Sequence, residues 1–182
     1  AHNHLSEAYL QKVDVEKLIS NPSIRLVDFN NDQLQEIWVK YDVMEDTVRR
    51  AHKIFAYEDG ELLSIFDSYE EIIDGIAPRL LHGFQAEVSF ADGSGFMFPI
   101  NKNSKAIQGK YNSTGVLLGD DLIVPEEIKY LKVLESSEDS SKILEGRISL
   151  KVQSTSIIVG DILVHWNYVE GYWHIIDYQI IE

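Results

Sequence analysis

The chain has no cysteine, and this absence removes several kinds of chemistry at once. Disulfide bridges, thiolate metal sites and cysteine nucleophiles are all excluded. The compartment stays open between the cytoplasm and export with removal of a signal segment, because proteins of both kinds can lack cysteine. The first residue is Ala1 rather than methionine, which fits a fragment and a mature protein equally well.

Basic residues are also scarce. The 182 residues include 16 Lys and Arg against 30 Asp and Glu, which gives a formal net charge of −14. The acidic residues are spread along the chain, so we expect a solvated acidic surface that repels phosphate backbones and does not bind nucleic acid. The same acidity leaves a second interpretation open, an inhibitor that binds a basic protein.

Long apolar runs and motifs of known chemistry are missing as well. No apolar run approaches the roughly 18 residues that cross a bilayer, so we do not expect the chain to span a membrane. No nucleophile elbow, phosphate loop or dinucleotide fingerprint occurs. The stretch Asp92-Gly-Ser-Gly95 lacks the spaced ligands of a calcium loop. The sequence therefore predicts no cofactor and no metal site, and no motif specifies a reaction.

The composition fits a single domain over residues 1–182. Hydrophobic residues make up 45% of the chain and aromatic residues 10%, which is enough for a sizeable core. Residues 1–80 are expected to be mainly helical, because apolar residues recur there every three or four positions. One such stripe lies within 5–19, and a short strand is expected at 24–29. The longer stripe comprises Leu34, Trp38, Tyr41, Met44, Val48, Ala51 and Phe55.

The segment 54–76 has two interpretations. Its apolar residues from Leu62 to Ile76 fit one helix, but 54–57 and 61–66 also fit a hairpin closed by Glu58-Asp59-Gly60. We favour the hairpin, because Asp-Gly is a strong turn signal. Ser68 and Glu71 then form a capping box that opens a shorter helix.

Residues 81–182 predict an antiparallel β-meander, since apolar segments follow one another with gaps too short for parallel crossovers. The expected strands are 84–90, 96–100, 114–118, 128–134, 143–152, 157–167 and 172–181. Helices followed by such strands define an α+β fold, with N-terminal helices packed on a long, curved antiparallel β-sheet.

The last two strands are expected to form a hairpin whose turn is Glu170-Gly171. In this register Val169 faces Tyr172, and the pairing continues until Val164 faces Asp177. One face carries Trp166, Tyr168, Trp173 and Asp177. The other face carries Asp161, His165, Asn167, Tyr172, His174 and Tyr178. With a turn at Ser154-Thr155, we expect Leu144, Ile148, Leu150 and Val152 on the His165 face.

The run 163–180 resembles the final hairpin of the NTF2-like superfamily, with the turn glycine Gly171, then Trp173, then an alternating strand ending near Asp177. The order of helices before a long antiparallel sheet is also similar. The resemblance implies a cone-shaped fold with a pocket between helices and sheet, often in a dimer. Members of the superfamily include enzymes, ligand binders and interaction domains, so the resemblance does not fix a function.

Two sets of residues are candidates for catalysis. Asp177 lies among the rings of Trp166, Tyr168 and Trp173, where loss of solvation would raise its pKa and suit it to act as a general base. The resemblance adds that some members of the superfamily use a cavity acid in this way. The alternative is an aspartate at the rim of the sheet.

The second set is the pair His165 and His174, with Asn167 and Asp161 nearby. Such a pair could shuttle a proton, whereas two histidines are too few for a zinc site. The alternative is a pair of hydrogen-bonded imidazoles on a half-exposed sheet surface.

Three functions remain open. The leading hypothesis is a non-catalytic domain that binds a small apolar ligand or a protein partner, with a homodimer as one arrangement. The second is an acid–base enzyme of the isomerase, dehydratase or cyclase type, and the third is the acidic inhibitor. The ligand-binding candidates are Trp166, Tyr168, Tyr172, Trp173 and Tyr178.

Overall fold

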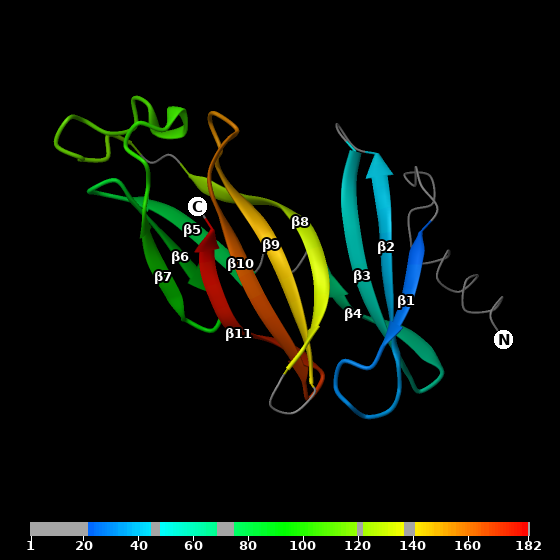
Figure 1. Ribbon diagram of the computed structural model, residues 1–182. Coiled ribbons are helices and arrows are strands. Elements are labelled where there is room, and N and C mark those ends of the chain that lie inside the picture. The colour runs from blue at the N-terminus through cyan, green and yellow to red at the C-terminus, as the bar shows by residue number, and fades with distance from the viewer. Residues whose placement is uncertain (1–21, 45–47, 69–74, 120–121, 137–140, 182) are drawn as a thin grey trace.

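The computed structural model describes residues 22–44, 48–68, 75–119, 122–136 and 141–181. In these residues the chain is nearly all β, with strands in three antiparallel sheets (Figure 1). The single helical element among the described ones is a 3-10 turn, η2 (Lys105–Ile107). The expected α+β fold, with N-terminal helices on a curved sheet, is therefore wrong. In the described part of the chain, no helix is long and apolar enough to cross a membrane.

The first sheet, called the N-terminal sheet here, has the order β1-β2-β3-β4. Its strands are β1 (Ser23–Val27), β2 (Glu36–Met44), β3 (Val48–Glu58) and β4 (Glu61–Asp67). The small sheet has the order β5-β6-β7. Its strands are β5 (Ile76–Leu81), β6 (Gln85–Phe90) and β7 (Gly95–Pro99).

The third sheet, called the central sheet, has the order β11-β10-β9-β8 and lies between the other two in Figure 1. Its strands are β8 (Ile123–Glu135), β9 (Lys142–Val152), β10 (Ile157–Val169) and β11 (Tyr172–Ile181). Each of these strands has ten or more residues. They carry most of the residues that the sequence singles out.

The helix expected from Leu34 to Phe55 is instead β2 and β3. Both faces of β2 are covered, since all four residues from Glu36 to Val39 are buried. A strand buried on both sides loses the alternation of apolar and polar residues that identifies strands. The remaining apolar positions then match a helical spacing by coincidence, and tertiary packing decides the structure.

The hairpin at 54–66 is confirmed, because β3 pairs with β4 from Glu58 opposite Glu61 onward. Its turn residues Asp59 and Gly60 have φ of 48° and 90°, the left-handed values that a two-residue hairpin turn needs. The helix expected within 5–19 lies outside the described residues. The same holds for most of the short helix expected after Ser68.

Most expected strands in the second half are confirmed. The segment 114–118 is an exception, since it contributes only an isolated bridge between Tyr111 and Leu117. The sequence also missed β5, because Pro78 indicated the end of a helix. Proline is tolerated there because β5 is an edge strand of the small sheet.

One cluster of buried side chains draws on all three sheets. The central sheet contributes every second residue of β10, from Ile162 through Val164 and Trp166 to Tyr168. The N-terminal sheet contributes Trp38, Ile54 and Phe66, and the small sheet contributes Ala86, Val88, Phe90 and Phe98. The opposite face of β10 is therefore the one left for polar side chains.

Candidate functional site

The closing hairpin has the expected register only near its turn. The pairs from Val169 with Tyr172 to Trp166 with Ile175 are confirmed. Ile176 is then an extra residue in β11, so that Asp177 lies opposite His165 instead of Val164. Because this bulge shifts the alternation, Asp177 lies on the His165 face and not on the Trp166 face.

The register expected for β9 is also wrong by one residue. Glu145 pairs with His165, and Leu144 pairs with Trp166. The charged residues of β9 therefore share a face with His165, which we call the polar face of the central sheet. Its apolar residues, including Ile148 and Leu150, share the buried face of Trp166.

The aromatic residues proposed as a ligand site pack in the core or lie free on the surface. Trp166 and Trp173 both contact Phe66 edge-on, and Tyr168 packs on Trp173. Tyr178 stacks on Phe96 of the small sheet, and its hydroxyl donates to the backbone of Gly95. Tyr172 is exposed on the polar side of the hairpin.

On the polar face, the first centre of charge is the buried carboxylate of Glu145. It lies 2.8 Å from His165 Nε2 and 2.6 Å from Lys132 Nζ, and it accepts a hydrogen bond of 3.1 Å from the Tyr130 hydroxyl. Burial opposes ionisation, but the hydrogen bonds from Lys132, His165 and Tyr130 outweigh it and lower the pKa of Glu145. Asp177 Oδ2 lies 3.4 Å from the other ring nitrogen of His165.

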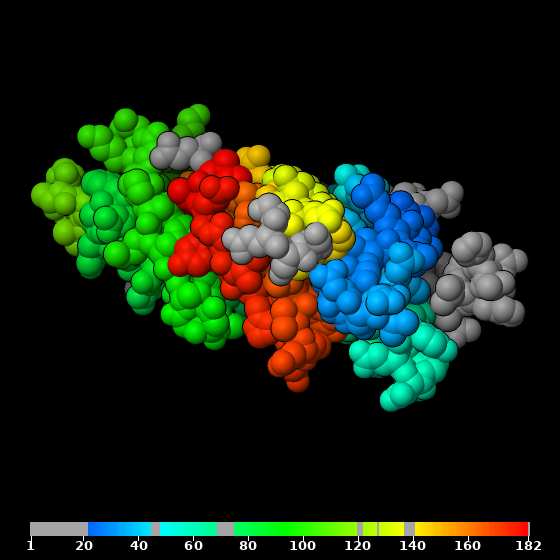
Figure 2. All heavy atoms as spheres, turned by 60° about the horizontal axis from the view of Figure 1, so that its bottom comes forward, coloured from blue at the N-terminus to red at the C-terminus, as the bar shows by residue number. Residues whose placement is uncertain are grey.

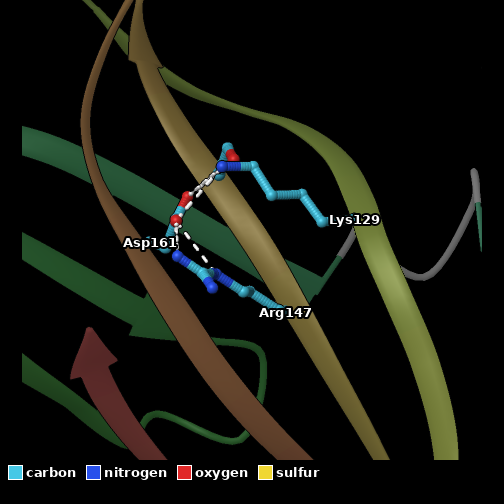
Figure 3. A network of polar contacts seen from close by, with 4 residues as sticks. Lys129, Arg147 and Asp161 are labelled. Atoms are coloured by element: carbon cyan, nitrogen blue, oxygen red, sulfur yellow. Dashed lines mark hydrogen bonds and ion pairs between the residues drawn. The ribbon is translucent and has the colours of Figure 1, made fainter. Parts of the chain in front are cut away.

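The second centre is the carboxylate of Asp161, shown in Figure 3 with Arg147 and Lys129 reaching toward it from β9 and β8. Arg147 contacts it through two nitrogens, at 3.0 and 2.5 Å, and Lys129 Nζ lies 3.0 Å away. The buried Ser149 hydroxyl donates to it at 2.6 Å. Burial again opposes ionisation, and these donors outweigh it and hold the pKa of Asp161 below its usual value.

The ion pairs of Glu145 and Asp161 suit these carboxylates to stabilising the sheet better than to transferring protons. A general base works best with a pKa near the operating pH, whereas Glu145 and Asp161 both have lowered pKa values. Asp177 and His174 are exposed on β11. Of the residues proposed for catalysis, the structure brings only His165 and Asp177 together. The described residues contain no group of three or more His, Asp or Glu that could hold a metal ion.

The sequence interpretation missed the acidic loop between β1 and β2. Asp28 accepts hydrogen bonds from the backbone N–H groups of Asp32 and Gln33, and Asp32 accepts one from Leu34. The spacing of Asp28, Asn30 and Asp32 matches the first three ligand positions of an EF-hand loop. The twelfth position, which supplies a bidentate glutamate in such loops, is the buried Val39. The side chains of Asp28 and Asp32 therefore hold the loop backbone in place through hydrogen bonds.

Replacement of Asp28 by alanine is expected to lower the free energy of unfolding by about 1 kcal/mol, because two exposed backbone donors exchange a carboxylate acceptor for water. The loss is larger for a loop in which Gln33 has φ of 70° than for an unstrained turn. Urea titration followed by circular dichroism measures it. Asp28→Asn, which keeps one acceptor oxygen, should lose less, and equal stability of Asp28→Ala and the parent would contradict this role.

A shallow cleft of about 270 Å³ lies between β7 and the outer ends of β10 and β11. Its walls are mainly apolar, and they comprise Phe98, Pro99, Ile158, Val159, Gly160, Asp161, Ile180 and Ile181. None of the residues that the sequence proposed as ligand contacts lines it. Comparison with protein-family models, with curated proteins and with solved structures finds no match to this chain, so the NTF2-like resemblance of the hairpin stays untested.

Proposed function

We propose that this chain is a non-catalytic protein-interaction domain that binds an extended partner segment along the first half of β11. The observation that carries the proposal is the exposure of large side chains on an edge strand. Tyr172 is 72% and Ile176 51% exposed, and β11 is the outermost strand of the central sheet among the described strands. Unpaired edge strands accept a further strand, with backbone hydrogen bonds for affinity and alternate side chains for specificity.

The side chains and the charge of this surface indicate which kind of partner it would bind. Tyrosine is enriched among residues that dominate binding energy at protein interfaces, so Tyr172 is the expected anchor. The chain carries a net charge of −14, which favours association with a neutral or basic partner and slows association with an acidic one. The acid–base enzyme is the weaker hypothesis, since its candidates Asp177 and His174 are exposed on β11 and Asp177 does not lie among aromatic rings.

The test is capture of a binding partner from the native source, with wild-type protein and two variants. Tyr172→Ala combined with Ile176→Ser should abolish the capture of a protein that the wild type retains. Met97→Ser is the matched control, because Met97 is an exposed apolar residue on β7 of the small sheet. The captured protein is then purified, and its binding to all three forms is measured directly. The proposal would be contradicted if the Tyr172→Ala/Ile176→Ser double variant bound the captured protein as tightly as the wild type does. Failure to capture any reproducible partner would also contradict it.

A further inference from the structure

A second, smaller cleft lies between the N-terminal sheet and β8, at a distance in the fold from the proposed partner strand. It has a volume of about 90 Å³ and is lined by Ser23, Arg25, Trp38, Lys40 and Leu131. A cavity of about 10–15 Å³ in this measure already holds a water molecule, so the cleft has room for one compact ion. Figure 2 shows the N-terminal sheet, in blue, against β8, in yellow.

Cross-strand pairing brings the polar groups of this cleft together. Ser23 of β1 lies opposite Lys40 of β2, and Lys40 lies opposite His52 of β3. Two pairs along the strands, and so on the same face, Arg25 lies opposite Trp38. Directly opposed residues share one face of a sheet, so the hydroxyl, the ammonium and the guanidinium lie on the same face, the one that meets β8.

Arg25 and Lys40 differ from the other cations of the described sheets. Every Lys and Arg of the central sheet contacts a carboxylate, namely Lys129, Lys132, Lys142, Arg147 and Lys151. Among the described residues, neither Arg25 nor Lys40 has such a contact; the Arg25 guanidinium lies over the Trp38 ring, 5.8 Å from its centre. Two cations that contact no carboxylate of the described residues, beside an aromatic wall, form a positive site in a strongly acidic protein.

His52 adds a second observation behind the same wall. Its side chain is 1% exposed, and its Nδ1 accepts a 3.3 Å hydrogen bond from Trp38 Nε1. Nδ1 is therefore the unprotonated nitrogen and Nε2 carries the hydrogen, yet Nε2 has no hydrogen-bond partner in the described part of the chain. A buried donor without an acceptor is costly, and here it lies in the same cross-strand row as Lys40.

We infer that this cleft is a binding site for a small oxyanion, such as phosphate, sulfate or a carboxylate group. The Arg25 guanidinium and the Lys40 ammonium supply the positive charge, and the Ser23 hydroxyl supplies a neutral donor. Planar guanidinium groups match the oxygen geometry of such ions. The inference does not depend on the proposed partner strand, since Tyr172 and Ile176 belong to the central sheet and none of its β11 residues lines this cleft.

The experiment is an NMR titration of the full chain with sodium phosphate, sodium sulfate and sodium acetate, at constant ionic strength set with sodium chloride. The Trp38 indole N–H is the reporter, because it donates to His52 at the wall of the cleft. A saturable shift of this signal with at least one of the three anions is expected. No saturable shift with any of them would overturn the inference.

Variants then locate the site. Arg25→Gln and Lys40→Gln are each expected to weaken binding at least tenfold, and both side chains are exposed, so the fold should persist. Lys102→Gln removes an equal charge at an exposed position without a carboxylate partner in the described residues, and it should bind as the parent does. Equal weakening by all three variants would show a general charge effect and overturn the site. As a second readout, the anion should raise the melting temperature of the parent but not that of an Arg25→Gln/Lys40→Gln double variant.

Discussion

Replacement of Trp166 by alanine is expected to lower the free energy of unfolding by about 3–5 kcal/mol, the usual range for removal of a buried tryptophan. Trp166 is 4% exposed and contacts Phe66 edge-on at a ring distance of 6.0 Å. Its ring also lies on Gly146, where an added Cβ would come within 2.7 Å of the indole. Gly146 has no side chain that could fill the space left by the indole, so the replacement leaves a cavity.

The measurement is urea unfolding of the parent and the variant, followed by far-ultraviolet circular dichroism. Tyr172→Ala is the matched control, because it removes an aromatic ring from the same hairpin at an exposed position. It should change the free energy of unfolding by less than about 1 kcal/mol. Similar losses in the two variants would mean that Trp166 does not hold the sheets together.

A change of pH from 7 to 4 is expected to remove about 3 kcal/mol of stability through His52 alone. Burial, then the charges of Lys40 and Arg50, lower the pKa of His52 from 6.5 to about 4, with Asp42 acting in the opposite sense. The difference between these values corresponds to roughly 1.4 kcal/mol for each pKa unit. The unfolded chain binds the proton first, so the contribution of the neutral imidazole is present above pH 6.5 and is lost as the pH falls toward 4.

His52→Asn separates this effect from other titrations, because the asparagine oxygen can accept the Trp38 N–H hydrogen bond but does not titrate. The difference in free energy of unfolding between the parent and His52→Asn should change by about 3 kcal/mol between pH 7 and pH 4. A parent-to-His52→Asn difference that does not vary with pH would show that the pKa of His52 is the same in the folded and the unfolded protein.

Local signals in the sequence were sufficient where the structure depends on local chemistry. The turns at Asp59-Gly60 and Glu170-Gly171 both have positive φ at each residue, which is why an acid followed by glycine predicts them. The helix expected across β2 is wrong because Trp38 on one face of β2 is buried in a cluster with the central sheet, whose strands lie far away in sequence. No window of neighbouring residues contains that information.

The candidate site shows the same limit. His165 and Asp177 were both chosen from the hairpin, yet the bulge at Ile176 was needed to bring them together. The partner carboxylate of Glu145 belongs to β9, and its position depends on a register that was predicted one residue out. Arg25 and Lys40 lie two cross-strand pairs apart on one face of β1 and β2, so no spacing along the chain could have linked them.

The bulge at Ile176 also limits how much of β11 can pair with a strand of another chain. A regular ten-residue edge strand such as β11 would offer an uninterrupted template for pairing with copies of the same chain. The extra residue interrupts the ladder after Ile175, and the strand beyond it is packed against the small sheet through Tyr178. Regular pairing from outside is thereby confined to the stretch Tyr172–Ile175, with the exposed Ile176 next to it. This stretch is shorter than the roughly six or seven residues that are typical of fibril-forming segments.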